Sequence, residues 1–258
     1  MTELVSNDVT APDRAPTQRS GFVIQLARSD RDLLDSLRLR YRVFAKEMRA
    51  RLPRMDAAIE YDRFDRYCDH LLVREAITGL AVGCYRMMTP ERAREAGGFY
   101  SETEFDLAGI NKLRARTVEI GRACVHPAYR NGVVISLLWC GILKYVVRTG
   151  HDYIIGCASI PAGGDRRGAA ALCARLQRES AGPPEFRVHP KRPFRIEGDA
   201  GIESDAKLPP LVKAYLRLGA YACGDPAWDP EFGTADVLMM LPLSRMDPRY
   251  MLRLSRRA

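Results

Sequence analysis

The sequence lacks a C-x-x-C pair, although it contains 7 cysteines. Cys68 stands near His70 and Cys124 near His126, but a lone pair of ligands without a second pair is poor evidence for a metal site. Most of the cysteines lie among apolar residues, which is typical of reduced, buried thiols in a cytosolic protein. We therefore expect no metal, no disulfide framework and a cytoplasmic location.

Long hydrophobic runs are missing as well. The most apolar stretch, residues 133–147, is interrupted by Lys144 and falls short of the about 20 residues that a bilayer span needs. Residues 1–20 lack the charged and apolar blocks of a signal peptide, so we expect them to form a disordered tail. Membrane contact would then be peripheral, at the inner membrane face, through basic surface residues.

Acidic residues are fewer than basic ones, which leaves a formal net charge of +8. The basic residues gather at 166–195 and at the C-terminus. Such a surface attracts an acidic protein or an anionic membrane, or is simply a solvated face. Because no basic run is interleaved with aromatic residues, nucleic acid is not expected as a partner.

The hydrophobic pattern alternates between strands and helices. Strands are expected at 22–27, 70–75, 80–88, 117–125, 153–160 and 235–243. Helices are expected after Ser29, from Gly132 to Gly150, at 165–178, at 211–220 and from Pro248 onward. A chain of 258 residues with 47% apolar content can bury one core, so residues 21–258 are expected to form a single domain with a C-terminal extension. This order predicts an α/β (α+β) fold, with a mixed central sheet and helices on both faces.

Two charges, Glu119 and Arg122, interrupt the apolar strand in TVEIGRACVHPAYRNG. Strict alternation would place them on opposite faces of the sheet, whereas a bulge at Gly121 would return them to one side. They either form an ion pair that fixes the strand or take part in catalysis. The sequence has no evident Ser-His-Asp or Cys-His arrangement, which favours direct attack by an amine over an acyl-enzyme. Glu119 is then the best candidate for a base, and backbone amides near 123–126 are candidate oxyanion donors.

The strand EIGRACV, with the loop and helix after it, resembles the GNAT superfamily of acyl-transferring enzymes. The resemblance implies that this segment holds the pantetheine arm of a thioester donor, through Cys124, Val125, His126, Arg130, Asn131 and Gly132. His126 is alternatively a packing or capping residue. Acetyl-CoA users usually have a glycine-rich loop here, but β-branched residues follow Gly132 and hinder close approach of a pyrophosphate. Acyl carrier protein fits better as donor. Its 4′-phosphopantetheine would be a co-substrate, with no bound cofactor.

A second set of motifs resembles the acyl-homoserine-lactone synthases, GNAT relatives that use acyl carrier protein. These motifs are RLRYRVF, EYDRFD, GCYRMM and EIGR. The resemblance implies catalytic roles for Glu119 and Arg122, and substrate-binding roles for Arg40, Phe44, Asp62, Asp65, Arg86 and Phe105. The charged members could equally form a structural salt-bridge network, and Phe44 could belong to the core.

Nearly the whole chain, roughly residues 22–252, resembles the bacterial L-ornithine N-alpha-acyltransferases, with GDPAWD and TADV as distinctive segments. The resemblance implies transfer of a 3-hydroxyacyl chain from acyl carrier protein to the alpha-amino group of L-ornithine, which gives lyso-ornithine lipid. A guanidinium would bind the carboxylate of ornithine, and an acid its side-chain ammonium.

Basic residues at 166–195 would then receive the acidic surface of the carrier protein by electrostatic steering. The candidates are Arg166, Arg167, Arg175, Arg178, Lys191 and Arg192. A solubilising face is the alternative. Two other functions stay open: an enzyme of the same fold with another acceptor, such as an acyl-homoserine-lactone synthase, and a non-catalytic module that binds a carrier protein or a membrane.

Overall fold

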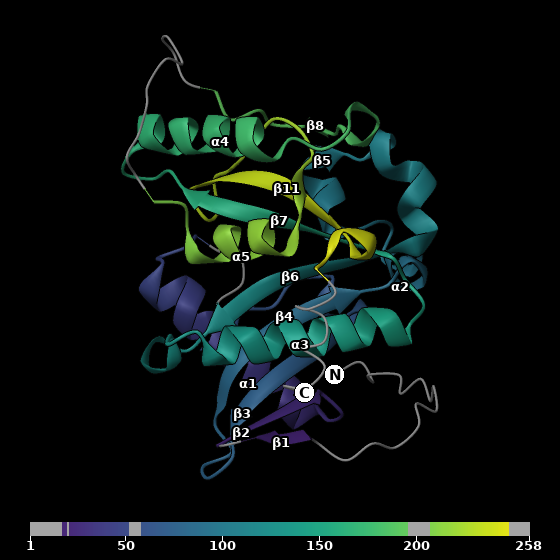
Figure 1. Ribbon diagram of the computed structural model, residues 1–258. Helices are drawn as coiled ribbons and strands as arrows, with labels where there is room; N and C mark the ends of the chain where they lie inside the picture. Colours follow the sequence, from purple (N-terminus) through teal and green to yellow (C-terminus); the bar gives the residue numbers. More distant parts are fainter. Residues whose placement is uncertain (1–16, 20, 52–57, 196–206, 248–258) are drawn as a thin grey trace.

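The computed structural model describes residues 17–19, 21–51, 58–195 and 207–247. Within these ranges, one mixed sheet of 9 strands has the order β1-β2-β3-β4-β6-β7-β11-β10, with β9 also paired to β11 (Figure 1). The predicted tail lies outside the described residues except for Thr17–Arg19, which form β1 and pair with β2. The helix predicted from Pro248 onward also lies outside them.

The predicted strands are present. They are β2 Phe22–Leu26, β3 Asp69–Glu75, β4 Ala81–Met88, β6 Thr117–Val125, β7 Tyr153–Pro161 and β11 Thr234–Pro242. Short strands that the sequence pattern did not indicate are β5 Phe105–Asp106, β8 His189–Pro190, β9 Tyr221–Ala222 and β10 Ala227–Asp229. Strands β5 and β8 form a separate two-stranded sheet.

The predicted helices are α1 Asp30–Arg40, α3 Val133–Arg148, α4 Arg166–Ser180 and α5 Pro210–Leu218. The Ser29 hydroxyl accepts a hydrogen bond from the Asp32 amide and so caps the start of α1, in line with the helix that was expected after Ser29. Helix α1 continues as a π-helix over Tyr41–Glu47. Additional short helices are α2 Pro90–Glu95 and the 3₁₀ segments η3 Asp65–Tyr67, η4 Tyr100–Thr103, η5 Ala108–Arg116, η6 Pro127–Tyr129, η7 Pro184–Phe186 and η8 Leu243–Arg245.

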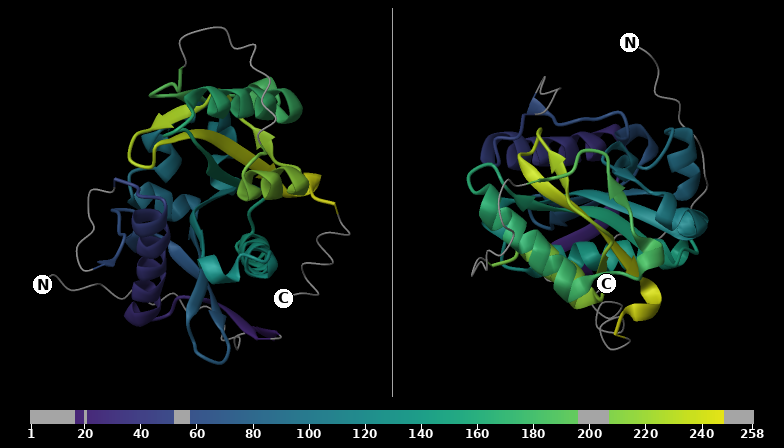
Figure 2. Two further views of the ribbon diagram at one scale, coloured as in Figure 1. Left: turned by 90° about the vertical axis from the view of Figure 1, so that its left-hand side faces the viewer. Right: turned by 90° about the horizontal axis from the view of Figure 1, so that it is seen from above.

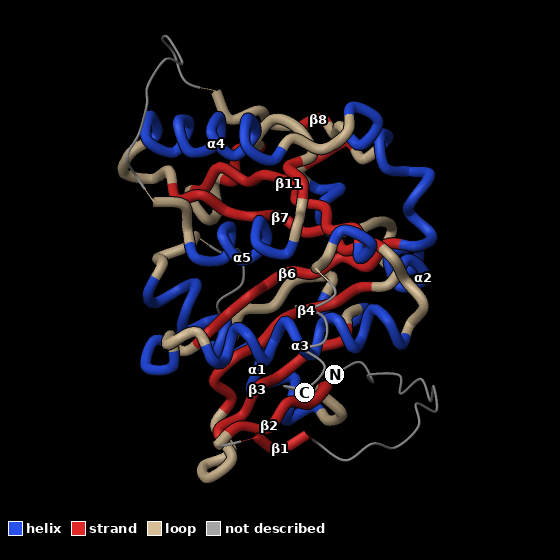
Figure 3. Tube along the Cα trace, viewed as in Figure 1, coloured by secondary structure: helices blue, strands red, loops and turns tan. Residues whose placement is uncertain are grey.

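Helices cover both faces of the sheet, as predicted. One hydrophobic cluster joins α3, α4 and α5 to one face, and two others join α1 and the short segments around α2 to the opposite face. The left view of Figure 2 shows α3 end-on, across the strands from α1, and Figure 3 shows the same layering along the trace. None of the helices within the described ranges has the length and apolar character of a membrane-spanning segment.

The sheet opens in its middle, where its one parallel pair of strands separates. Strands β6 and β7 pair only from Thr117 with Tyr153 to Glu119 with Ile155. Beyond that point β7 remains paired with β11, and β6 remains paired with β4. Gly156 marks the last close approach of the two strands, because a Cβ there would lie 2.4 Å from the Ile120 carbonyl oxygen. The gap between the two strands therefore starts beyond Ile120 and Gly156.

A β-bulge shapes the same stretch of β6. Arg86 pairs with Gly121 and Cys84 with Cys124, so that Arg122 and the next residue both stand opposite Tyr85. Arg122 has a φ of 51°, a left-handed conformation that is uncommon for a residue with a side chain. The sequence analysis placed the bulge at Gly121. In the structure it lies one residue further along the chain, at Arg122. Bulges of this kind re-aim side chains next to sites.

Candidate active site

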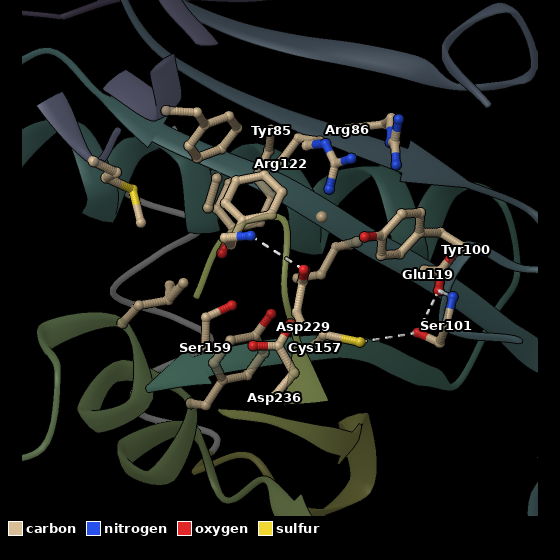
Figure 4. Close-up of a pocket in the computed structure, with 18 residues that line it drawn as sticks. Tyr85, Arg86, Tyr100, Ser101, Glu119, Arg122, Cys157, Ser159, Asp229 and Asp236 are labelled. Carbon is tan, nitrogen blue, oxygen red and sulfur yellow. Dashed lines mark hydrogen bonds between the residues drawn. The ribbon is translucent and has the colours of Figure 1, made fainter. Parts of the chain in front are cut away.

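A cavity of about 230 Å³ occupies the gap between β6 and β7 (Figure 4). Aromatic and apolar residues line it toward the face of the sheet that carries α3 and α5: Tyr85, Ile120, Ala123, Leu211 and Tyr215. Charged and polar residues line it toward the opposite face: Arg86, Ser101, Glu119, Arg122, Ser159, Asp229 and Asp236. The cavity is therefore apolar at one end, whereas the other end combines these charged and polar groups with the rings of Phe44, Tyr100 and Phe232.

Glu119 and Arg122 both line this cavity, because the bulge re-aims Arg122. The Glu119 carboxylate accepts hydrogen bonds from the Tyr100 amide at 2.6 Å, the Ser101 amide at 2.7 Å and the Ser101 hydroxyl at 2.5 Å. Burial nonetheless raises the pKa of Glu119 above its usual value. A carboxylate with a raised pKa is a better proton acceptor at neutral pH. Glu119 thus both anchors the segment Tyr100–Ser101 and meets the chemical requirement for a base.

Three arginines and three acids form a compact network, which we call the arginine cluster: Arg40, Arg86, Arg122, Glu60, Asp62 and Asp65. Arg40 donates to Asp65 at 2.5 and 3.1 Å and also pairs with Glu60. Arg86 donates to Asp62 at 2.6 Å and to Asp65 at 3.0 Å, and Arg122 donates to Asp62 at 2.9 Å. Glu60 is the first residue of the EYDRFD motif, but the sequence analysis did not assign it to the site.

Charges in the arginine cluster balance one another. Arg40 is 0% exposed and Asp65 is 1% exposed. Burial acts to raise the pKa of Asp65, but Arg40 and Arg86 overcome it and hold that pKa well below its usual range. Arg86 and Arg122 likewise lower the pKa of Asp62 against the effect of burial. Both aspartates that were predicted to bind substrate are therefore already committed to guanidinium partners.

A second charged group, which we call the acidic cluster, consists of Glu104, Asp229 and Asp236. Asp229 and Asp236 line the cavity and are 7% and 4% exposed. The side-chain oxygens of Glu104 and Asp236 lie within 4.8 Å of each other and of the Cys157 sulfur. Burial raises the pKa of Asp236 to about 6 and that of Glu104 well above its usual value, with further upward shifts from the neighbouring acids. The sequence analysis did not identify this cluster, although Asp229 and Asp236 stand in its distinctive GDPAWD and TADV segments.

The two predicted aromatic residues have different surroundings. Phe44 lines the cavity and packs edge-on against Phe232 at 5.2 Å between ring centroids. Phe105 is 0% exposed and belongs to a core cluster away from the cavity lining. Tyr100 instead supplies the aromatic wall, with the Arg122 guanidinium 4.7 Å and the Arg86 guanidinium 5.4 Å from its ring centroid. We therefore correct the assignment of Phe105 to the site.

The residues that were predicted to bind the donor do not line the cavity itself. They come directly after the cavity-lining part of β6 in the chain. Cys124 is buried against the α1 side of the sheet. The His126 amide donates to the Val82 carbonyl at 2.8 Å, so this amide is already used. The His126 ring accepts a hydrogen bond from the Ala128 amide and so caps η6. This contact agrees with the alternative that His126 is a packing or capping residue.

Around the start of α3, the loop residues hold one another in place. Arg130 donates to Val125 and to Glu47, and the Asn131 side chain accepts the Val133 amide. Gly132 has a φ of 89° immediately before α3. A left-handed φ of this kind favours glycine over residues with side chains. The loop is thus shaped by glycine at one position only, as the sequence indicated.

The predicted docking residues lie on and beyond α4. Arg166 stacks over Phe194 and Trp228 at 4.5 Å from each ring centroid, and Lys191 donates to the Glu102 carbonyl. Arg175 pairs with Glu179 at 2.8 Å. Arg167, Arg178 and Arg192 are exposed. The surface is therefore partly committed to internal contacts and partly accessible.

The fold and the cavity define a class of protein. The mixed sheet opens between two strands that pair in parallel only at their start, and the bulged strand beside the opening carries Glu119 and Arg122 into the cavity. The acetyltransferase (GNAT) domain family matches residues 39–140. This match places residues 39–140 in the class of GNAT acyltransferases. Among solved structures, a CoA-dependent acyl-homoserine lactone synthase, MesI, has 18% identity and a TM-score of 0.52, with 91% of this chain and 94% of that chain covered.

Curated relatives narrow the class to a family. An L-ornithine N(alpha)-acyltransferase of Agrobacterium fabrum is 38% identical, over 88% of this chain and 82% of the relative. Another from Brucella abortus is 36% identical, over 88% and 86%. The chain belongs to the family of L-ornithine N(alpha)-acyltransferases.

Proposed function

We propose that this enzyme transfers a 3-hydroxyacyl chain from acyl carrier protein to the alpha-amino group of L-ornithine, which gives lyso-ornithine lipid. The acceptor is the one named for the relatives, and the donor is inferred from the loop before α3. The observation that carries the proposal is the cavity between β6 and β7. It offers guanidinium and carboxyl groups at its polar end and an apolar end beside α3 and α5, so that an amino acid and an acyl thioester can meet there.

In the proposed reaction, the unprotonated alpha-amine of ornithine attacks the carbonyl carbon of the thioester. A C–N bond forms, the C–S bond breaks, and the pantetheine sulfur leaves as a thiol once it is protonated. Glu119 takes the amine proton, directly or through a water molecule, since it lines the cavity and has a raised pKa. Amides of β6 near residues 123–125 are candidates to stabilise the oxyanion; the amide of His126 is excluded because it is bonded to Val82.

The donor would be held through the 4′-phosphopantetheine of the carrier protein as a co-substrate. The strand and loop that carry Cys124, Val125, His126, Arg130, Asn131 and Gly132 lead from the cavity to the start of α3. Val133 and Val134 follow Gly132 in the first turn of α3, where a pyrophosphate would require closer approach to the backbone. We further propose that the enzyme works in the cytoplasm, with peripheral contact at the inner membrane face, where its product would partition.

The direct test is to incubate the purified enzyme with 3-hydroxyacyl carrier protein, or the matching acyl-CoA, and a panel of amino acids. Consumption of ornithine with release of the carrier thiol is expected, with the carrier-protein donor used more efficiently than acyl-CoA. Acylation of another amino acid, or of S-adenosylmethionine, in place of ornithine would rule the proposed acceptor out.

Glu119→Gln should lower turnover by at least about tenfold, since a positioned base typically contributes 10²–10⁴-fold. Because Glu119 also anchors Tyr100 and Ser101, Ser101→Ala serves as the matched control: it removes one hydrogen bond to the carboxylate and keeps the carboxylate itself. If Ser101→Ala and Glu119→Gln lost activity equally, Glu119 would be a positioning residue and the base would lie elsewhere. A flat pH profile for Glu119→Gln, in place of the rising limb of the unaltered enzyme, would identify it as the base.

A further inference from the structure

The acidic cluster brings together carboxyl groups from three parts of the chain. Glu104 follows η4, Asp229 ends β10, and Asp236 lies in β11 opposite Ser159. One Asp229 oxygen accepts the amides of Glu231 and Phe232, and one Asp236 oxygen accepts the Thr234 hydroxyl. These contacts fix the two aspartates in place at the polar end of the cavity (Figure 4).

The cations of the described chain do not neutralise this cluster: Arg122 acts to lower the pKa of Glu104, but burial and the neighbouring acids outweigh it and keep that pKa well above its usual value. Among the residues in the described ranges, none forms a salt bridge with Glu104, Asp229 or Asp236. Both Glu104 oxygens are buried without a hydrogen-bond partner, although the Tyr100 hydroxyl and the Asp236 carboxyl lie close by. Burying acids together without a counterion is unfavourable. A protein that needed only a stable core would place apolar side chains here, so the arrangement indicates a cationic ligand.

An organic ammonium fits the cluster better than a metal ion does. The sulfur of Cys157 lies beside Glu104 and Asp236, but burial raises the pKa of its thiol well above the usual value. The thiol therefore stays protonated and is a poor metal ligand. The two aspartates face a cavity of about 230 Å³, which has room for the carbon chain of a ligand. An ammonium also carries N–H donors, which match the carboxyl acceptors of the two aspartates that line the cavity.

The arginine cluster cannot supply this acid. Asp65 is shared by Arg40 and Arg86, and Asp62 by Arg86 and Arg122. The cluster is better suited to the opposite charge, because the Arg86 and Arg122 side chains both line the cavity, although the Arg122 Nε itself is paired with Glu60 at 3.4 Å. Arg86 and Arg122 lie on one side of the cavity in Figure 4, and Asp229 and Asp236 on the other. The cavity is thus polarised in the way that a zwitterion with a second ammonium group requires.

We propose that Glu104, Asp229 and Asp236 bind the side-chain ammonium of the acceptor and make the enzyme select a basic amino acid over a neutral one of the same length. This assignment rests on the proposed function, since it concerns the acceptor of that reaction. Asp229 and Asp236 would touch the ammonium from the cavity lining, and Glu104 would complete the cluster from behind Asp236. The acceptor carboxylate would lie toward Arg86 and Arg122.

The test compares two acceptors that differ only at the side-chain terminus: ornithine and norvaline, which has the same carbon chain without the second amine. The unaltered enzyme should prefer ornithine in kcat/KM by about a hundredfold or more, because a buried acid left without its partner disfavours the neutral analogue. Asp236→Asn and Glu104→Gln should each lower kcat/KM for ornithine by at least about tenfold and leave norvaline unchanged or improved. Asp152→Asn, which alters a surface acid paired with Arg116, is the matched control and should change neither.

The outcomes separate this proposal from the proposed function. If Asp236→Asn and Glu104→Gln acylate ornithine but keep the full preference over norvaline, the ammonium assignment is wrong and the proposed function stands. Failure of the unaltered enzyme to acylate any amino acid would overturn both. Loss of the ornithine preference on treatment with EDTA would show that a metal ion occupies the cluster, and would overturn the assignment as well. Circular dichroism of each variant establishes that it is folded.

Discussion

The arginine cluster and the acidic cluster lie on the same face of one sheet, yet their electrostatics differ. In the first, three guanidinium groups meet three carboxylates, and the pKa values of Asp62 and Asp65 are lowered. In the second, three carboxyl groups lie together without a described cation, and the pKa values of Glu104 and Asp236 are raised. Buried charges are stabilised only when they are paired. The first cluster is therefore balanced by its own residues, whereas we propose that a ligand balances the second.

This difference changes how the sequence motifs are interpreted. Arg40, Asp62, Asp65 and Arg86 were predicted as substrate contacts or as a structural network. Their contacts indicate that Arg40 and Asp65 stabilise the fold, because both are enclosed by the network and neither lines the cavity. Arg86 and Arg122 belong to the network and also line the cavity. The network thus holds two guanidinium groups in position for a ligand.

The largest effect should come from breaking the balanced cluster. Asp65→Asn leaves Arg40 and Arg86 short of a buried counterion, and removal of one member of a buried ion pair typically costs about 3–5 kcal/mol. The free energy of unfolding, measured by urea denaturation at pH 7, should fall by this amount. Asp62→Asn, at a position whose side chain is 21% exposed, should cost less. Equal stability of Asp65→Asn and the unaltered protein would show that the network does not stabilise the fold.

An opposite effect is expected in the acidic cluster. The pKa of Asp236 is raised to about 6, so this group favours folding when protonated. That contribution is complete below its unfolded pKa, declines as the pH rises from about 4 to 6, and is lost above. Asp236→Asn should therefore match the unaltered protein near pH 4 and be more stable by about 1–3 kcal/mol at pH 8, since one pKa unit corresponds to about 1.4 kcal/mol. Urea denaturation at both pH values measures this, and destabilisation at pH 8 would show that the ionised group is already compensated.

The smallest effect concerns the exposed arginines of α4. Reversing the charge at Arg167 and Arg178 should raise KM for an acyl carrier protein donor by about tenfold at low ionic strength, because steering of an acidic partner is lost. The effect should shrink at 0.5 M salt, where exposed charges are screened. Arg94→Glu, on the opposite face in α2, is the matched control. If all these variants had the same KM, α4 would be a solubilising surface.

Local patterns were sufficient for the elements that carry their own signal. The Ser29 cap, the apolar spacing of α1 and α3, and the strands β3, β4, β6, β7 and β11 follow from neighbouring residues in the chain. The π-helical turn at Tyr41–Glu47 and the two-residue strands were not predicted, because tertiary contacts rather than local periodicity determine them. The sequence analysis considered a bulge at Gly121, but its exact place, one residue further on, depends on how β6 pairs with β4.

The sequence by itself determined the family, the alternating fold and most members of the arginine cluster, since motifs and periodicity are local properties. Only the tertiary structure decided which charges meet. It brought Glu60 to Arg40, turned Arg122 into the cavity through a left-handed residue, and placed Phe105 in the core with Tyr100 at the site instead. It also assembled Glu104, Asp229 and Asp236 from segments up to 132 residues apart. Such contacts depend on strand pairing and on burial, which fix the partner and the pKa of each charge, and neither is a property of any short stretch of chain.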